Sequence, residues 1–240
     1  MSTPGFIGFD RKVELEWLDG VAARASAGDT RLEAMRWLHA VALSTLAGDG
    51  AHGAKGKTAT VLLRIWYPQD VRSLELRNTA LKLLPDASPS DRLALHWALS
   101  IAAYPFFAAV AQQVGRLVGL QGDASTRDVT RRVAEQYGDR STLSRAVQRV
   151  LGSMAAWKAL IVERSVLRPA MKHTVSAPVA LLLARAVLFG LPGRSVPLEA
   201  LVREPALFAF DVSLSLADVQ GDAGLQVDRL GYDDVHVTAR

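Results

Sequence analysis

The chain has 240 residues, of which 50% are apolar and 22% are charged, so it can bury a core and is not disordered throughout. It contains no cysteine, which excludes disulfides, thiolate zinc sites and cysteine nucleophiles and favours a reducing compartment. The net charge is +4, and residues 1–10 lack the basic start and apolar run of a secretory signal, so we expect a cytoplasmic protein.

The first part of the chain is expected to be helical. Apolar residues recur at intervals of three and four over residues 11–27 and 30–46, which predicts two helices. Residues 48–57 are glycine-rich but miss the phosphate-binding pattern, because the required glycine, Gly50, lies one position too early. A surface loop is expected there. Residues 58–66 fit neither period cleanly and could form a short helix or a buried strand.

Prolines divide the next stretch into separate helices. We expect helices over residues 71–84, 88–103 and 105–120, with a break at Tyr104-Pro105. Residues 93–115 are 23 positions without Asp, Glu, Lys or Arg, long enough to span a membrane. Because Pro105 leaves two pieces that are each too short, we expect a buried helix pair and no membrane partner.

The segment that follows has the pattern of a helix-turn-helix. Ser125 and Asp128 resemble a capping box, and the first helix is expected to stop at Gly138. After a short link, Ser141 can cap a second helix. Its apolar positions keep helical spacing: Leu143, Ala146, Val147, Val150, Leu151, Met154 and Trp157. Two helices joined by a tight turn that contains glycine are typical of this motif.

The other face of the second helix carries the side chains of a DNA recognition helix. Arginine can bind guanine and glutamine can bind adenine through two hydrogen bonds each, and threonine can contact a phosphate or a thymine methyl. Backbone amides at the helix start favour a phosphate. The residues expected to contact DNA here are Arg140, Ser141, Thr142, Arg145, Gln148 and Arg149.

A basic wing is expected after this helix. Leu160-Ile161-Val162 has the composition of a strand, and residues 163–175 bring Arg164, Arg168, Lys172 and His173 together around a proline. Such side chains neutralise phosphates and contribute salt-dependent affinity with little sequence information. Residues 126–172 hold ten basic and four acidic residues, a charge of +6, which leaves −2 for the rest of the chain.

The last third of the chain changes character. Residues 176–189 and 197–203 predict two helices, and partial alternation over 207–216 and 225–238 predicts a small terminal sheet. No internal repeat is evident in the sequence.

Together these features predict a mainly α fold with a helical N-terminal module, a winged helix-turn-helix and a small C-terminal β element. We place the helical module at residues 1–120 and the remainder at 121–240. The predicted partner is double-stranded DNA, and a homodimer is left open. The alternatives are a basic face that docks an acidic protein, and RNA binding.

No catalytic, cofactor or metal site is predicted, so we do not expect an enzyme. The five histidines lack the spacing of metal ligands. Asp228, Asp233, Asp234 and His236 could suggest a nuclease-type metal site, but no lysine accompanies them. Charges on an exposed edge strand that prevent aggregation explain them as well.

Several short motifs carry a resemblance to a known group of proteins. In order they are Gly56-Lys57-Thr58, Leu93-Ala94-Leu95-His96-Trp97, Tyr104-Pro105-Phe106-Phe107, Tyr137-Gly138-Asp139-Arg140-Ser141-Thr142 and Trp157. Their order resembles helical proteins of bacterial phage-defence islands. It is more distantly similar to the small DNA-binding accessory protein of bacteriophage-exclusion (BREX) systems.

The resemblance covers residues 56–160 and implies DNA binding beside larger defence enzymes, without a catalytic site. It leaves a second reading open, in which the chain is a non-enzymatic scaffold subunit that docks a defence complex. The predicted strands from Leu207 onward depart from the resemblance.

Overall fold

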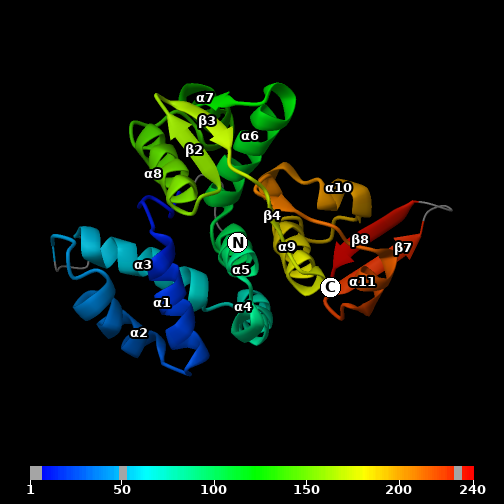
Figure 1. Cartoon of the computed structure of the whole chain (residues 1–240), viewed down its shortest axis with the longest axis horizontal. Coiled ribbons are helices and arrows are strands. Elements are labelled where there is room, and N and C mark those ends of the chain that lie inside the picture. Colours follow the sequence, from blue (N-terminus) through cyan, green and yellow to red (C-terminus); the bar gives the residue numbers. More distant parts are fainter. Residues whose placement is uncertain (1–6, 49–52, 230–233) are drawn as a thin grey trace.

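The fold is mainly α with three small sheets (Figure 1). The computed structural model describes residues 7–48, 53–229 and 234–240. Helices predominate over the first half of the chain, and all of the strands lie after residue 123 in the described ranges. The mainly α prediction is therefore confirmed. The division of the chain after residue 120 stays a prediction.

Three helices and a π-helical turn open the chain: α1 (Leu15–Ser26), α2 (Arg31–Trp37), η1 (Leu38–Ala42) and α3 (Ala54–Trp66). Thr30 caps α2 in a full capping box with Glu33. The prediction of a loop over residues 48–57 is wrong for its last residues, because the chain is already helical from Ala54 onward. Residues 49–52 of this segment lie outside the described ranges. The ambiguous segment 58–66 is helical, and its burial on all faces except that of Thr60 and Arg64 explains why its apolar residues show no clear helical period.

The central helices are α4 (Val71–Leu83), α5 (Pro89–Ala103) and α6 (Pro105–Gln121), with a 3-10 turn η2 (Leu84–Asp86) after α4. Ser88 caps α5 by accepting a hydrogen bond from the Asp91 amide at 3.0 Å. Pro105 starts α6 at the predicted break. In the described ranges, no single helix is both long and apolar enough to cross a membrane; α5 and α6 pass that test only as a pair bent by 117°.

The first sheet lies beside α6. Its strands are β1 (Ala124–Ser125), β2 (Leu160–Glu163) and β3 (Val166–Pro169), antiparallel in the order β1-β3-β2. Helices α7 (Thr126–Tyr137) and α8 (Leu143–Ala156) lie in the chain between β1 and β2. The first unit, residues 105–169, therefore has the order helix, strand, helix, helix, strand, strand.

A similar order, with one interruption, occurs in the last part of the chain. Helix α9 (Ala177–Phe189) leads to β5, α10, α11, β7 and β8, but a 3-10 turn and a short strand within residues 205–211 lie between α10 and α11. The sheet of this part has the order β5-β8-β7. The bounds of these elements are β5 (Val196–Pro197), α10 (Leu198–Val202), α11 (Leu216–Gly221), β7 (Leu225–Arg229) and β8 (Val235–Ala239). This second unit, residues 177–240, has an apolar cluster of its own, which includes Leu188, Leu201 and Val237.

The predicted terminal sheet is right for residues 225–238 and wrong for 207–216. After the 3-10 turn η3 (Pro205–Leu207), the only strand there is β6 (Phe210–Asp211), which pairs in parallel with β4 (His173–Thr174). Buried Phe210 packs edge-on against Trp97 at 5.5 Å between ring centroids, so it anchors this segment to the main core instead of the terminal sheet.

His96 joins three helices inside the main core. It is fully buried on α5, accepts a hydrogen bond from Trp66 Nε1 on α3 at 3.1 Å, and lies 3.1 Å from the Asp19 carboxylate on α1. With Nδ1 as acceptor, Nε2 carries the proton and donates to Asp19. Burial lowers the pKa of His96 from its ordinary value of 6.5, outweighing the opposing effect of Asp19.

Replacing His96 tests how much its hydrogen bonds to Trp66 and Asp19 stabilise the fold. His96→Phe leaves the buried Trp66 N–H without its acceptor, so the free energy of unfolding should fall by about 2 kcal/mol in urea titrations. Because the folded pKa is depressed, stability from neutral His96 is present above pH 6.5 and is lost as the pH falls towards the lower folded pKa. Between pH 6.5 and the lower folded pKa, the free energy of unfolding of the wild type should therefore fall more than that of the variant. Equal losses in the two proteins would contradict a buried, neutral His96.

Two glycines of α6 provide a matched pair for the contact between α6 and η3. A Cβ on buried Gly115 would clash with the Pro205 carbonyl oxygen, whereas a Cβ on exposed Gly119 meets nothing within 4 Å. Gly115→Ala should lower the free energy of unfolding by roughly 1–3 kcal/mol or more through overpacking. Gly119→Ala should raise it by about 0.5–1 kcal/mol, because alanine favours the helix. Similar values for both variants in urea titrations would exclude this close contact.

Candidate nucleic-acid interface

Helix α7 begins and ends where the sequence predicts. Ser125 accepts a hydrogen bond from the Asp128 amide at 2.9 Å and donates to the Asp128 carboxylate at 2.7 Å. The bond that Ser125 donates to the carboxylate lowers the pKa of Asp128, which keeps a negative charge at the positive end of the helix. Gly138 ends the helix with φ of +79°, a left-handed conformation that glycine adopts without strain.

Helix α8 begins one residue later than expected. The predicted Ser141 cap is wrong: the N-cap is Thr142, whose side chain makes no capping bond. The Leu143 amide donates to the Arg140 carbonyl at 2.9 Å, which closes a tight turn over residues 140–143. Thr142 already has a helical backbone in this turn, so neither hydroxyl meets the geometry of a cap.

The predicted apolar stripe of α8 is buried and fixes the helix to the start of the chain. Its six helical positions and Trp157 all lie in the main core. Trp157 Nε1 donates to the Val13 carbonyl at 2.9 Å, and the Val13 amide donates to Ser153 Oγ at 2.9 Å. Both bonds join residues about 140 positions apart, so the orientation of α8 is set by the whole fold and not by its neighbours in sequence.

The opposite face of α8 is exposed. The side chains predicted to read bases, Thr142, Arg145, Gln148 and Arg149, are all exposed, as are Arg140 and Ser141 in the turn. Among the described residues, neither Arg145 nor Arg149 has a carboxylate within 4.0 Å. Two arginines one helical turn apart thus keep their charge for an external partner.

The strands β2 and β3 form the hairpin expected for the wing. Arg164 and Ser165 make its two-residue turn, both with positive φ, of 47° and 70°. Arg168 on β3 lies 3.4 Å from Glu163 on β2, and Lys172, beyond β3, lies 3.6 Å from Asp211. Of the three predicted wing cations, only Arg164 has no carboxylate this close in the described ranges. His173 belongs to β4 and not to the hairpin.

Two further basic residues lie at α8 that the sequence analysis did not assign. Lys158 follows Trp157 at the end of the helix, exposed and with φ of +60°. Lys12 comes from before α1, and its side chain would lie 3.6 Å from a Cβ on Gly152 in α8. The position of Lys12 depends on the bonds from Val13, so no local sequence signal could have revealed it.

Three of the four residues weighed as a metal site lie in the part of the chain that the structure describes. Asp228 and His236 face each other across β7 and β8, and His236 lies 2.9 Å from Asp234. Asp233 lies outside the described residues. Within those residues, no group of three His, Asp or Glu side chains is placed to hold a metal ion.

The hairpin turn allows a test of its geometry. Turns with two residues at positive φ favour Asn-Gly, whereas other residues are strained there by roughly 1–2 kcal/mol each. Replacing Arg164-Ser165 by Asn-Gly should therefore raise the free energy of unfolding by about 1 kcal/mol in urea titrations. Arg164→Ala retains the strained backbone and is the control that should give no such gain. A loss of stability with Asn-Gly would contradict this turn.

No known protein family, curated protein or solved structure matches this chain.

Proposed function

We propose that this protein binds double-stranded DNA through α8 and the β2–β3 hairpin, and that residues 105–169 form a winged helix-turn-helix. The order α6, β1, α7, α8, β2, β3 and the sheet order β1-β3-β2 support this proposal. In such an arrangement the second helix of the pair enters the major groove.

The observation that carries the proposal is the exposed, unneutralised face of α8. Arg145 and Arg149 can each bind guanine through two hydrogen bonds, and Gln148 between them can bind adenine. The apolar side of the same helix is fixed by the buried Trp157. A rigid helix with long polar side chains on its free side suits the reading of base edges.

The second unit provides a contrast within the same chain. It repeats most of the order of elements, yet residues 177–240 hold five basic and eight acidic residues, a charge of −3. Its counterpart of α8 is α11, only six residues long, with Asp218 in its first turn. Phosphates repel such a surface, so we assign DNA contact to the first unit alone.

We further propose that the protein is a non-enzymatic accessory protein of a bacterial phage-defence system. This part rests on the resemblance of residues 56–160 and not on the site. The second unit, with little positive charge, would then be free to contact other components of the system. Cytoplasmic location and assembly into a homodimer belong to the same proposal.

Gel-shift titrations over a series of salt concentrations test the binding proposal. The wild type should bind a duplex more weakly as salt rises, because each phosphate that it neutralises releases counterions. Arg145→Ala with Arg149→Ala should weaken binding at least tenfold, since each good arginine contact with a base contributes about 1–3 kcal/mol. If these arginines also neutralise phosphates, the salt slope of the variant should be shallower by about 0.9 per phosphate.

The matched control removes two exposed arginines from the second unit, Arg203 and Arg229. This double variant carries the same charge change and should bind DNA within twofold of the wild type. Equal weakening in both double variants would show that only total charge matters and would overturn the assignment to α8. Absence of duplex binding by the wild type, with co-purification of a partner protein, would favour the scaffold role instead.

A further inference from the structure

A large cleft lies between the N-terminal helices and the rest of the molecule. Its volume is about 1090 Å³, near the upper end of the roughly 300–1,000 Å³ typical of small-molecule sites. Helices α3 and α4 line one side, and α6, the end of α7 and the end of α9 line the other. Ligand sites are frequent where modules meet in this way.

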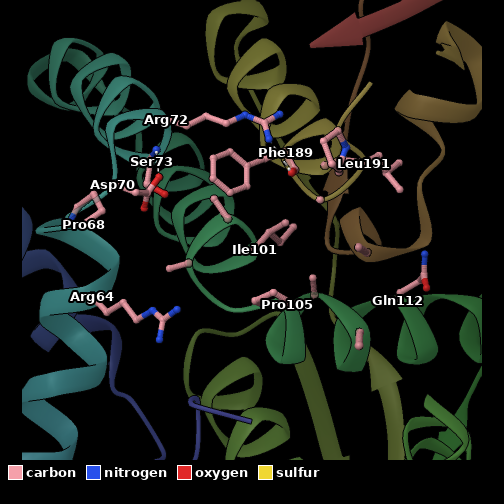
Figure 2. A pocket seen from close by; sticks show the side chains of 18 of the residues that line it. Arg64, Pro68, Asp70, Arg72, Ser73, Ile101, Pro105, Gln112, Phe189 and Leu191 are labelled. Atoms are coloured by element: carbon pink, nitrogen blue, oxygen red, sulfur yellow. Dashed lines mark hydrogen bonds between the residues drawn. The ribbon is translucent and has the colours of Figure 1, made fainter. Parts of the chain in front are cut away.

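Three arginines from three different helices line this cleft: Arg31 on α2, Arg64 on α3 and Arg72 on α4. Figure 2 shows Arg64 extending from α3 and Arg72 reaching from α4 towards Phe189. Aromatic rings hold both guanidinium groups, with Arg64 5.1 Å from the Tyr104 ring centre and Arg72 4.5 Å from that of Phe189. The positive charges are therefore positioned before any ligand binds.

The negative charges in the lining are already engaged by N–H donors. Among the described residues, Asp70 and Glu204 are the carboxylates that line the cleft. Asp70 accepts the Ser73 amide at 2.8 Å as the cap of α4, and Glu204 accepts Gln112 Nε2 at 2.8 Å. In the described ranges neither carboxylate forms an ion pair with Arg31 or Arg72. Arg72 Nη1 donates to the Phe189 carbonyl at 3.3 Å, and the guanidinium group has further N–H donors for an external anion.

Two buried donors of lining residues also lack partners in the described structure. They are Arg31 Nε and the Tyr67 hydroxyl. Burial raises the pKa of Tyr67 to about 12, so the hydroxyl keeps its proton near neutral pH. A buried donor left without an acceptor costs roughly 1–3 kcal/mol, and a ligand rich in acceptor oxygens would remove that cost.

Much of the remaining lining is apolar, including Ile101, Pro105 and Leu191, although Thr60 and Gln136 are polar. The ligand should therefore combine an anionic group with a less polar portion. Guanidinium groups match phosphate oxygens through paired hydrogen bonds. We propose that this cleft binds a phosphorylated small molecule of the nucleotide class, with its phosphates at the arginines and its ring against the apolar side. The proposal does not depend on DNA binding.

Isothermal titration of the full chain with ADP, adenosine and inorganic phosphate tests the proposal. ADP should bind at least tenfold more tightly than either fragment, because only ADP occupies both parts of the cleft. Equal affinity for ADP and phosphate would show that the ring does not contribute to binding and would exclude a ligand of the nucleotide class. Failure of ADP to bind, or tighter binding of a short acidic peptide, would overturn the site as proposed.

Arg31→Gln should weaken ADP binding at least tenfold, and Arg36→Gln, on the same helix but outside the lining of the cleft, should leave it within twofold. Thermal unfolding without ligand separates a folding defect from a binding defect. If Arg31→Gln unfolds more easily, Arg72→Gln provides a second variant for the same comparison. Equal effects of Arg31→Gln and Arg36→Gln on ADP binding would place the nucleotide elsewhere.

Discussion

Trp97 lies where several distant parts of the chain meet. Its ring has edge-on contacts with Phe107 on α6, Trp157 after α8, Phe208 just before β6 and Phe210 on β6. Its indole N–H donates to the Ala206 carbonyl at 2.9 Å, so the side chain is fully buried without an unpaired donor. Large buried aromatic side chains contribute strongly to core stability. Burial of this ring holds α5, α6 and α8 in one arrangement and thereby orients the exposed face of α8.

The two units share most of their order of elements but differ in surface charge. Both contain the order helix, strand, helix, helix, strand, strand, which residues 205–211 interrupt in the second unit, and both sheets place the last strand in the middle. Only the first has a long second helix with arginines exposed on its free side, while the second has a short helix and a negative charge. Residue type and helix length, more than topology, distinguish what each unit can bind.

Local signals predicted much of the candidate site. The Ser125 cap, the Gly138 end and the buried stripe of α8 are all as expected, because each depends on residues within one or two helical turns. The Ser141 cap failed because a turn closed by Arg140 and Leu143 places Thr142 in a helical conformation first. The prediction that residues 207–216 join the terminal sheet was wrong because burial of Phe210 against Trp97 outweighed the weak alternation of the segment.

The sequence by itself determined the helical class, most helix boundaries and the amphipathic character of α8, since capping, proline breaks and periodicity act over a few residues. Tertiary structure alone decided which of the predicted wing cations are neutralised: Arg168 lies beside Glu163, and Lys172 lies beside Asp211. It also formed the arginine-lined cleft. These features join residues up to a hundred positions or more apart, and packing of the whole core brings them together.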